Sequence, residues 1–363
     1  MAITRIGNPA IADVRGVNFR NIIINGDMSV SQRSTSASSI TSSGYHALDR
    51  HRLAISSLGT WTISQSTDVP TGQGFGKSMK FDCTTADASP SASDVMWVQH
   101  RIEGQNLQYL KKGTSSAEKT TLSFWVKSNK TGTYIAELED TDNSRHIAKS
   151  YTISSADTWE KKTITFDGDT TGTLTNDNNT SLELHLYLGA GTNYTSGTLA
   201  TSWASNTDAN RAVGQVNLAD STSNEWYVTG IQLEAGSQAS DFEFLPHDVN
   251  FNRCLRYCYR INGNSADQKT FGVGVATDSN TGQIQIPHPI PMRAEPTITE
   301  SDIQIAYRAS AANASLSGDT DESIFVSTLI IDMDSGTPLT TGDAVRGRIN
   351  TGASNFVQMD AEL

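Results

Sequence analysis

The sequence predicts an all-β protein, in which an antiparallel β-sandwich is followed by a short linker helix and a second, smaller β-sandwich. Residues 121–128 (Thr-Leu-Ser-Phe-Trp-Val-Lys-Ser) alternate apolar and polar side chains, as in a strand with two different faces. The same alternation recurs at residues 96–102, 134–138, 163–166, 182–188 and 226–233. The spacers are rich in turn residues and contain no strong helical segment, a pattern typical of an antiparallel sandwich.

Composition supports this fold and excludes one class of partner. Apolar residues make up 36% and charged residues 18% of the 363 residues, a balance that suits sheets with polar outer faces. The chain is long enough for two domains. It has 27 Lys and Arg against 39 Asp and Glu, a net charge of -12, and no basic run. Binding a phosphate backbone needs clustered cations, so no nucleic-acid partner is expected.

The cysteines and the apolar segments indicate a soluble protein made in a reducing cytoplasm. Cys83, Cys254 and Cys258 form no Cys-x-x-Cys pair, so we expect them to be reduced, partly buried, small apolar residues. The N-terminus lacks the apolar core of a signal peptide, and no segment approaches the roughly 20 apolar residues of a membrane span. Membrane insertion is therefore not expected.

The first sandwich is expected over residues 21–245, after an N-terminal arm. Residues 1–20 have too few apolar residues to form a unit, so they are an arm that lies on another surface, or an edge strand or lead-in loop of the sandwich. The Ile run of residues 21–24 predicts a buried strand. Asn25, Gly26 and Asp27 then supply a tight turn.

A linker helix over residues 246–261 precedes the second domain. Asp248 can cap it, and an apolar stripe recurs at helical spacing, at Phe251, Leu255, Cys258 and Tyr259. We expect the stripe to pack on a neighbouring domain or on another copy of the chain. Strand patterns return over residues 262–363, where three prolines exclude a helix at residues 287–291, and predict the second β-sandwich.

Strand alternation also predicts a second, polar face on the first sandwich. If Leu182, Leu184, Leu186 and Leu188 point into the core, the residues between them point outward. Sugars bind such faces through Trp and Tyr rings and a few polar contacts. The alternative is that a loop such as residues 189–210, or another subunit, covers the face. The candidate carbohydrate-binding residues are Trp97, Gln99, Arg101, Trp125, Lys127, Glu137, Glu183, His185 and Tyr187.

Signs of enzymatic chemistry are weak. No hydrolase elbow, zinc-binding helix or dinucleotide fingerprint is present, and the seven histidines, without metal-ligand spacing, are expected at the surface or at edges. Glu137 and Glu183 could act as the two carboxyls of a glycan depolymerase, but alternation does not set their separation. The chain is expected not to be an enzyme. Two acidic loops, residues 140–144 and 167–172, resemble calcium loops or are ordinary hairpin turns.

Several segments resemble a family of bacteriophage virion proteins, described as tail fibre or structural proteins. They are residues 21–33 (Asn-Ile-Ile-Ile-Asn-Gly-Asp-Met-Ser-Val-Ser-Gln-Arg), 48–50, 121–128, 228–243, 254–260 (Cys-Leu-Arg-Tyr-Cys-Tyr-Arg), 286–296 and 359–363. The resemblance implies a homotrimeric, non-enzymatic fibre or receptor-binding protein in the virion, assembled in the host cytoplasm. Its arm, residues 1–20, would contact other virion proteins, and its β-domains would contact host surface glycan. A purely structural role, as a head decoration or tail adaptor, is the alternative.

Residues 21–240 also resemble the jelly-roll carbohydrate-binding modules of polysaccharide-degrading enzymes, whose first strand carries a similar Asn-Gly-Asp turn. This resemblance implies that the first sandwich is a jelly roll. It also implies a possible structural calcium held by Asp27 and Glu234, although Met28 and Ser29 replace the usual aromatic-acid pair. No other cofactor is expected.

Overall fold

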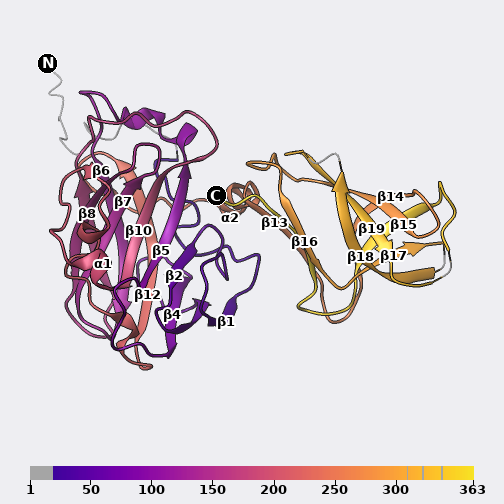
Figure 1. The fold of residues 1–363 in the computed structure, drawn as a ribbon, viewed down its shortest axis with the longest axis horizontal. Coiled ribbons are helices and arrows are strands. Elements are labelled where there is room, and N and C mark those ends of the chain that lie inside the picture. Colours follow the sequence, from indigo (N-terminus) through magenta and orange to yellow (C-terminus); the bar gives the residue numbers. More distant parts are fainter. Residues whose placement is uncertain (1–18, 309, 321–322, 337) are drawn as a thin grey trace, which may run out of the picture. The chain divides into compact units, whose positions relative to one another are not determined.

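The structure is a computed structural model that describes residues 19–308, 310–320, 323–336 and 338–363 (Figure 1). The chain divides into two compact units, the first ending at Pro246 and the second running from His247 to Leu363. Strands dominate both units, which confirms the all-β fold class. No helix in these ranges is long and apolar enough to cross a membrane. The predicted arm, residues 1–20, lies outside the described residues except for Phe19 and Arg20.

The first unit is a sandwich of two six-stranded antiparallel sheets, as predicted. Sheet A has the order β1 (Ser36–Ile40), β3 (Thr60–Ser66), β4 (Ser78–Thr85), β12 (Glu225–Ala235), β6 (Thr120–Ser128) and β9 (Glu160–Phe166). Sheet B has the order β11 (Ala204–Ser205), β8 (Arg145–Ile153), β7 (Gly132–Asp140), β10 (Thr180–Ala190), β5 (Val95–Glu103) and β2 (Arg52–Ser56). Short helices lie in the connections: η1 (Gly104–Asn106), η2 (Gln108–Leu110), α1 (Thr192–Thr195), η3 (Asp208–Asn210) and η4 (Leu218–Asp220).

The core of the first unit lies between the two sheets. Alternate residues of β10 enter it as predicted, and so do Phe124 and Val126 of β6. Each such apolar side chain contributes about 1.5–3 kcal/mol when it leaves water. The alternation therefore determines which face of each sheet is buried and which can carry polar side chains.

The predicted strand at residues 21–24 is wrong, although its isoleucines are buried. The segment lies beside β12, and the Ile22 N–H donates to the Leu233 carbonyl of that strand at 2.9 Å. Asn25 and Met28 have positive φ values of 59° and 61°, which turn the chain before a ladder can form. The Asn25 side-chain amide holds this turn by donating to the Val30 carbonyl at 2.9 Å.

The second unit begins with a shorter helix than predicted. Helix α2 spans His247–Leu255, and the chain then extends into β13 (Cys258–Asn262), which pairs with the last strand β21 (Phe356–Asp360). Cys258 and Tyr259 therefore lie in a strand rather than on the helical stripe. All three cysteines are buried, more fully than the partial burial that was expected.

The second unit contains a closed barrel instead of the predicted two stacked sheets. A three-stranded sheet, β13-β21-β16 (Thr297–Ser301), accompanies it. The second unit has a core of its own, which includes the fully buried Ile284, Ile305 and Leu329. The barrel order is β14 (Lys269–Ala276), β15 (Thr281–Pro287), β19 (Val326–Met333), β18 (Ser310–Thr320), β17 (Ile303–Tyr307) and β20 (Ala344–Ile349).

Candidate functional site

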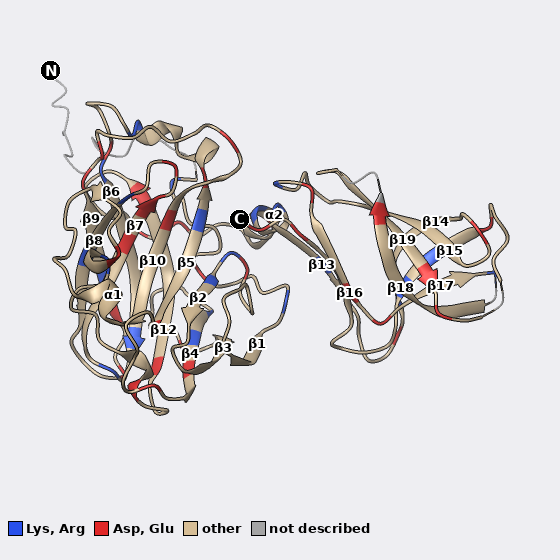
Figure 2. Cartoon of the chain, in the orientation of Figure 1, with Lys and Arg blue, Asp and Glu red and all other residues tan. Residues whose placement is uncertain are grey.

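The outer face of sheet B brings together most of the predicted carbohydrate-binding residues. Antiparallel register aligns them in rows across β2, β5, β10 and β7, because directly paired residues point to the same side. Figure 2 shows acidic positions on β7 and β10 beside basic positions on β5 and β2. The rows are Ala54-Trp97-Tyr187, then Arg52-Gln99-His185-Glu137, then Arg101-Glu183-Glu139-His146.

Glu137 is the centre of a buried ion-pair network. Its carboxylate lies 2.7 Å from His146 Nδ1 and 2.9 Å from His185 Nδ1, and it accepts a hydrogen bond of 2.9 Å from the Tyr187 hydroxyl. Arg211 donates to it from Nε at 3.1 Å and from a terminal nitrogen at 2.9 Å. Burial alone would raise the pKa of Glu137, but the histidine hydrogen bonds and the Arg211 charge lower it well below its usual range.

His185 links this network to the neighbouring carboxylate. Its Nε2 lies 2.8 Å from Glu183, which also pairs with Arg101 Nε at 3.0 Å and accepts from the Gln99 amide. Burial lowers the pKa of His185, but hydrogen bonds to Glu137 and Glu183 outweigh burial and raise it to about 9. An imidazolium at neutral pH donates from both ring nitrogens to the two carboxylates.

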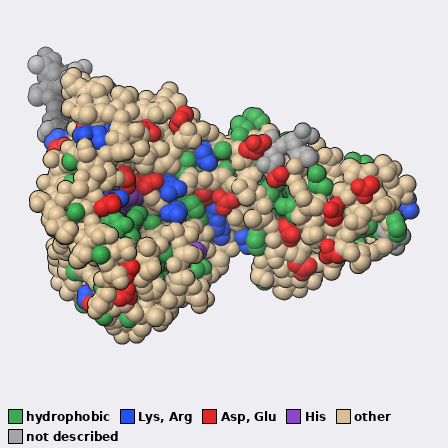
Figure 3. Space-filling model, viewed as in Figure 1, with side chains coloured by type: hydrophobic (Ala, Val, Ile, Leu, Met, Phe, Trp, Pro, Cys, Tyr) green, Lys and Arg blue, Asp and Glu red, His purple; other side chains and the backbone are tan. Residues whose placement is uncertain are grey.

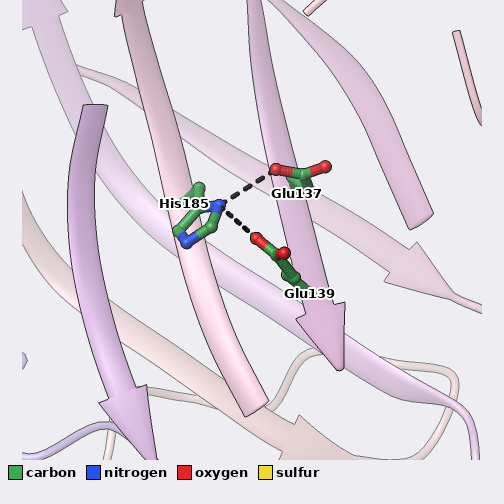
Figure 4. Close-up of side chains that lie close together, drawn as sticks. All are labelled: Glu137, Glu139 and His185. Carbon is green, nitrogen blue, oxygen red and sulfur yellow. Dashed lines mark hydrogen bonds and ion pairs between the residues drawn. The ribbon is translucent and has the colours of Figure 1, made fainter. Parts of the chain in front are cut away.

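The geometry of Glu137, Glu139 and His185 resembles a metal site. Ligand atoms of the three lie within 4.8 Å of one another, and Figure 4 shows both carboxylates directed at one imidazole nitrogen. The Arg211 guanidinium, however, lies 2.9 Å from Glu137, 2.5 Å from Glu139 and 3.2 Å from His185 Nδ1. A cation of the protein itself thus neutralises the group, and these residues do not favour a metal.

The face is partly covered, as the alternative interpretation expected. The segment that contains α1 and η3 carries Arg211 over the sheet, and Glu137, His185 and Tyr187 are fully buried. Trp97 and Arg101 keep part of their side chains exposed. In Figure 3 acidic, basic, histidine and hydrophobic side chains gather on the visible face of this unit. The row ends on β5 and β2 are therefore accessible, and the centre of the network is not.

The expectation that Trp125 and Lys127 share this surface is wrong. Both lie on β6 of sheet A, so they belong to the opposite side of the sandwich. There Lys127 lies 4.3 Å from the centre of the Tyr227 ring and pairs with Asp68. Trp159 joins the same cluster by donating to Asp68 at 2.9 Å.

The structure does not bring Asp27 and Glu234 together in any three-residue group of potential metal ligands within the described ranges. Asp27 accepts from the Ser29 hydroxyl at 3.1 Å. The Glu234 carboxylate accepts from the Ser240 backbone N–H at 2.8 Å and hydroxyl at 2.7 Å, and Arg20 lies 3.7 Å away. These hydrogen bonds satisfy each carboxylate locally.

The two acidic loops meet around a lysine. The Lys112 ammonium contacts Asp140 and lies 3.0 Å from Asp169, and it donates to the carbonyls of Thr171 at 3.2 Å and Gly172 at 3.1 Å. Carboxylate and carbonyl oxygens are calcium ligands, but here they surround an ammonium group. Lys112 is therefore the internal cation of this site.

Sequence reasoning missed Arg52, Glu139, His146 and Arg211. Glu139 could have been found, because alternation puts it on the same face of its strand as Glu137. Alternation could not place Arg52, because it lies beside Gln99 only through the pairing of β2 with β5. His146 was expected at the surface or at an edge, yet it is buried, as are His51, His100 and His185. Arg211 lies in a connection without any periodic signal.

No known protein family and no curated protein matches the chain. Among solved structures, the active domain of bacteriophage CBA120 tailspike protein 4 matches with 12% identity and a TM-score of 0.31, over 60% of this chain and only 22% of that one. A putative sugar binding protein from Bacteroides thetaiotaomicron matches with 14% identity and a TM-score of 0.32, over 59% of this chain and 99% of that one. The module TmCBM61, in complex with galactotriose, matches with 9% identity and a TM-score of 0.31, over 60% of this chain and 99% of that one. Because these identities and TM-scores are low, the matches carry no inference about ligand or role.

Proposed function

We propose that the first unit is a glycan-binding domain and that the partly exposed Trp97 and Arg101 contact the sugar, while the buried Gln99 and Glu183 hold the neighbouring side chains in place. The observation that carries this proposal is a half-buried indole beside charged and amide groups on one sheet face. Apolar sugar faces stack on aromatic rings, and hydroxyls pair with amides, carboxylates and guanidinium groups.

The network beneath these residues fixes them before a ligand arrives. The Trp97 ring packs against His185 at 5.1 Å and Tyr187 at 5.3 Å between ring centres, and the Arg211 guanidinium lies 5.5 Å from it. Gln99 is held between Arg52 and Glu183. Side chains that are already ordered lose little entropy on binding, which favours affinity.

The test is the binding of wild type and Trp97→Ala to a glycan array. Loss of an aromatic contact of about 2 kcal/mol should weaken binding roughly 30-fold. Trp125→Ala is the matched control, because it removes the same side chain from the opposite sheet, and it should bind as wild type does. Trp97→Phe keeps a ring for packing and should retain part of the affinity.

Equal array signals for Trp97→Ala and wild type would exclude this face as the binding site. A loss of binding in Trp125→Ala but not in Trp97→Ala would instead assign binding to the aromatic cluster of sheet A.

We further propose a non-enzymatic role in a phage virion, as a homotrimeric tail fibre or receptor-binding protein with its arm on other virion proteins. The sequence resemblance supports this role. A purely structural virion component is a second candidate, favoured by the covering segment that buries His185 and Tyr187. Microscopy of labelled particles and sedimentation of the purified chain distinguish tail from head and trimer from monomer.

The geometry argues against a depolymerase that uses Glu137 and Glu183. A general acid needs a raised pKa. Burial raises the pKa of Glu183, but the His185 hydrogen bond and the Arg101 charge outweigh it and lower the pKa, as Arg211 and two histidines do for Glu137. New reducing ends after incubation with polysaccharide would contradict the non-enzymatic proposal.

A further inference from the structure

We propose that the glycan recognised by this face carries an anionic group, a carboxylate or a sulfate ester, and that Arg52 binds it. This inference rests on the proposed glycan-binding function and adds the chemical class of the ligand. Arg52 lies at the end of the row that contains Gln99, one row away from Trp97. A sugar stacked on the indole can thus place a substituent at the guanidinium.

Arg52 is the cation on this face that has no carboxylate partner. Within the described part of the chain it forms one side-chain hydrogen bond, from a terminal nitrogen to Gln99 Oε1 at 2.8 Å, and no ion pair. A guanidinium has five N–H donors in a fork that matches a carboxylate or sulfate. Gln99 orients the group and leaves most of these donors for a ligand.

The carboxylates nearby already have cationic partners. Glu183 pairs with Arg101 at 3.0 Å and with His185 at 2.8 Å. Glu137 and Glu139 pair with Arg211 at 2.9 and 2.5 Å. Rearranging Glu183 toward Arg52 would break two existing contacts, so an external anion is the better partner.

Arg52 has a second arginine, Arg101, as a charged neighbour, although the chain as a whole has a net charge of -12. Burial and the nearby Arg101 lower the pKa of Arg52, with Tyr45 and Glu183 acting in the opposite direction. Burial also lowers the pKa of His46, as do the charges of Arg52 and Arg33, while its bond to the Ser42 carbonyl raises it. The Arg52 and Arg101 guanidinium groups therefore lie near each other at this end of the face, and Arg101 adds to the attraction for an anion.

The experiment measures binding of the full chain to two pairs of polymers that differ only in charge. The pairs are polygalacturonate with its methyl ester, and dextran sulfate with dextran. We expect wild type to prefer the anionic member of at least one pair tenfold or more, because hydrogen bonds to charged groups contribute that much. Which pair responds identifies carboxylate or sulfate. Arg52→Gln should abolish the preference.

Arg52→Lys keeps the charge but not the fork, and it should reduce the preference if geometry matters. Arg346→Gln, which removes an exposed arginine from the second unit, should change nothing. An unchanged preference in Arg52→Gln, or equal binding to both members of each pair, would overturn the anionic-ligand inference. Binding to neutral polymer that still depends on Trp97 would leave the proposed function standing, whereas no binding to any array glycan would overturn both.

Discussion

At the residue scale, charged side chains of the chain itself occupy two positions where the described part of the structure gathers oxygen ligands. Arg211 lies between Glu137 and Glu139, and Lys112 lies between Asp140 and Asp169. A cationic side chain takes the place of a bound metal ion at each position. When that side chain is removed, buried carboxylates lose a positive partner. Stability should therefore depend on these side chains and on their protonation more than on added metal.

The first residue-scale prediction concerns His185 and pH. Its pKa is raised from 6.5 to about 9 in the folded protein, equivalent to about 3 kcal/mol. Because the folded pKa is the higher one, this stabilisation is complete below about pH 6.5 and is lost as pH rises through about 9. Urea unfolding at pH 6 and pH 9 should show the loss in wild type.

His185→Gln should remove most of this pH dependence, whereas His46→Gln should retain it, because the pKa of His46 is lowered instead of raised. An equally steep loss of stability above pH 6.5 in His185→Gln would show that another group causes it.

At the element scale, alternation predicts the faces of strands but not their neighbours. The leucines of β10 enter the core as their spacing indicates. Alternation gave Trp125 an outward face without showing that β6 belongs to sheet A, because pairing is set by hydrogen bonds between distant segments. For the same reason, the local sequence pattern does not predict that β14 pairs with β20, although this pairing closes the barrel. Arg211 had no periodic signal at all.

The element-scale prediction concerns Lys112, which joins two loops that lie far apart in sequence. Lys112→Ala should destabilise the first unit by roughly 3–5 kcal/mol, because it leaves the fully buried Asp140 without its ion-pair partner, while Asp169 keeps Arg145 at 2.7 Å. The neighbouring Lys111 is exposed and pairs with Glu118 at 3.0 Å, so Lys111→Ala should cost at most about 1 kcal/mol. Equal denaturant midpoints for the two variants would contradict the role of Lys112.

At the scale of the whole molecule, each unit has its own hydrophobic core. One core is built from sheets A and B, and the other from the barrel and the three-stranded sheet. The candidate glycan-binding residues all lie in the first unit. The geometry of the ion-pair network around Glu137, and of the outer face of sheet B, should therefore depend on the stability of that unit alone.

The last prediction follows from these separate cores. Calorimetry of the full chain should resolve two unfolding transitions, because a unit with its own core unfolds cooperatively by itself. Lys112→Ala should lower only the transition of the first unit. Ile305→Ala, which truncates a fully buried side chain of the barrel, should cost about 2–5 kcal/mol and lower only the other transition. If either variant lowered both transitions equally, or if wild type unfolded in one transition, the two units would have to be treated as a single cooperative body.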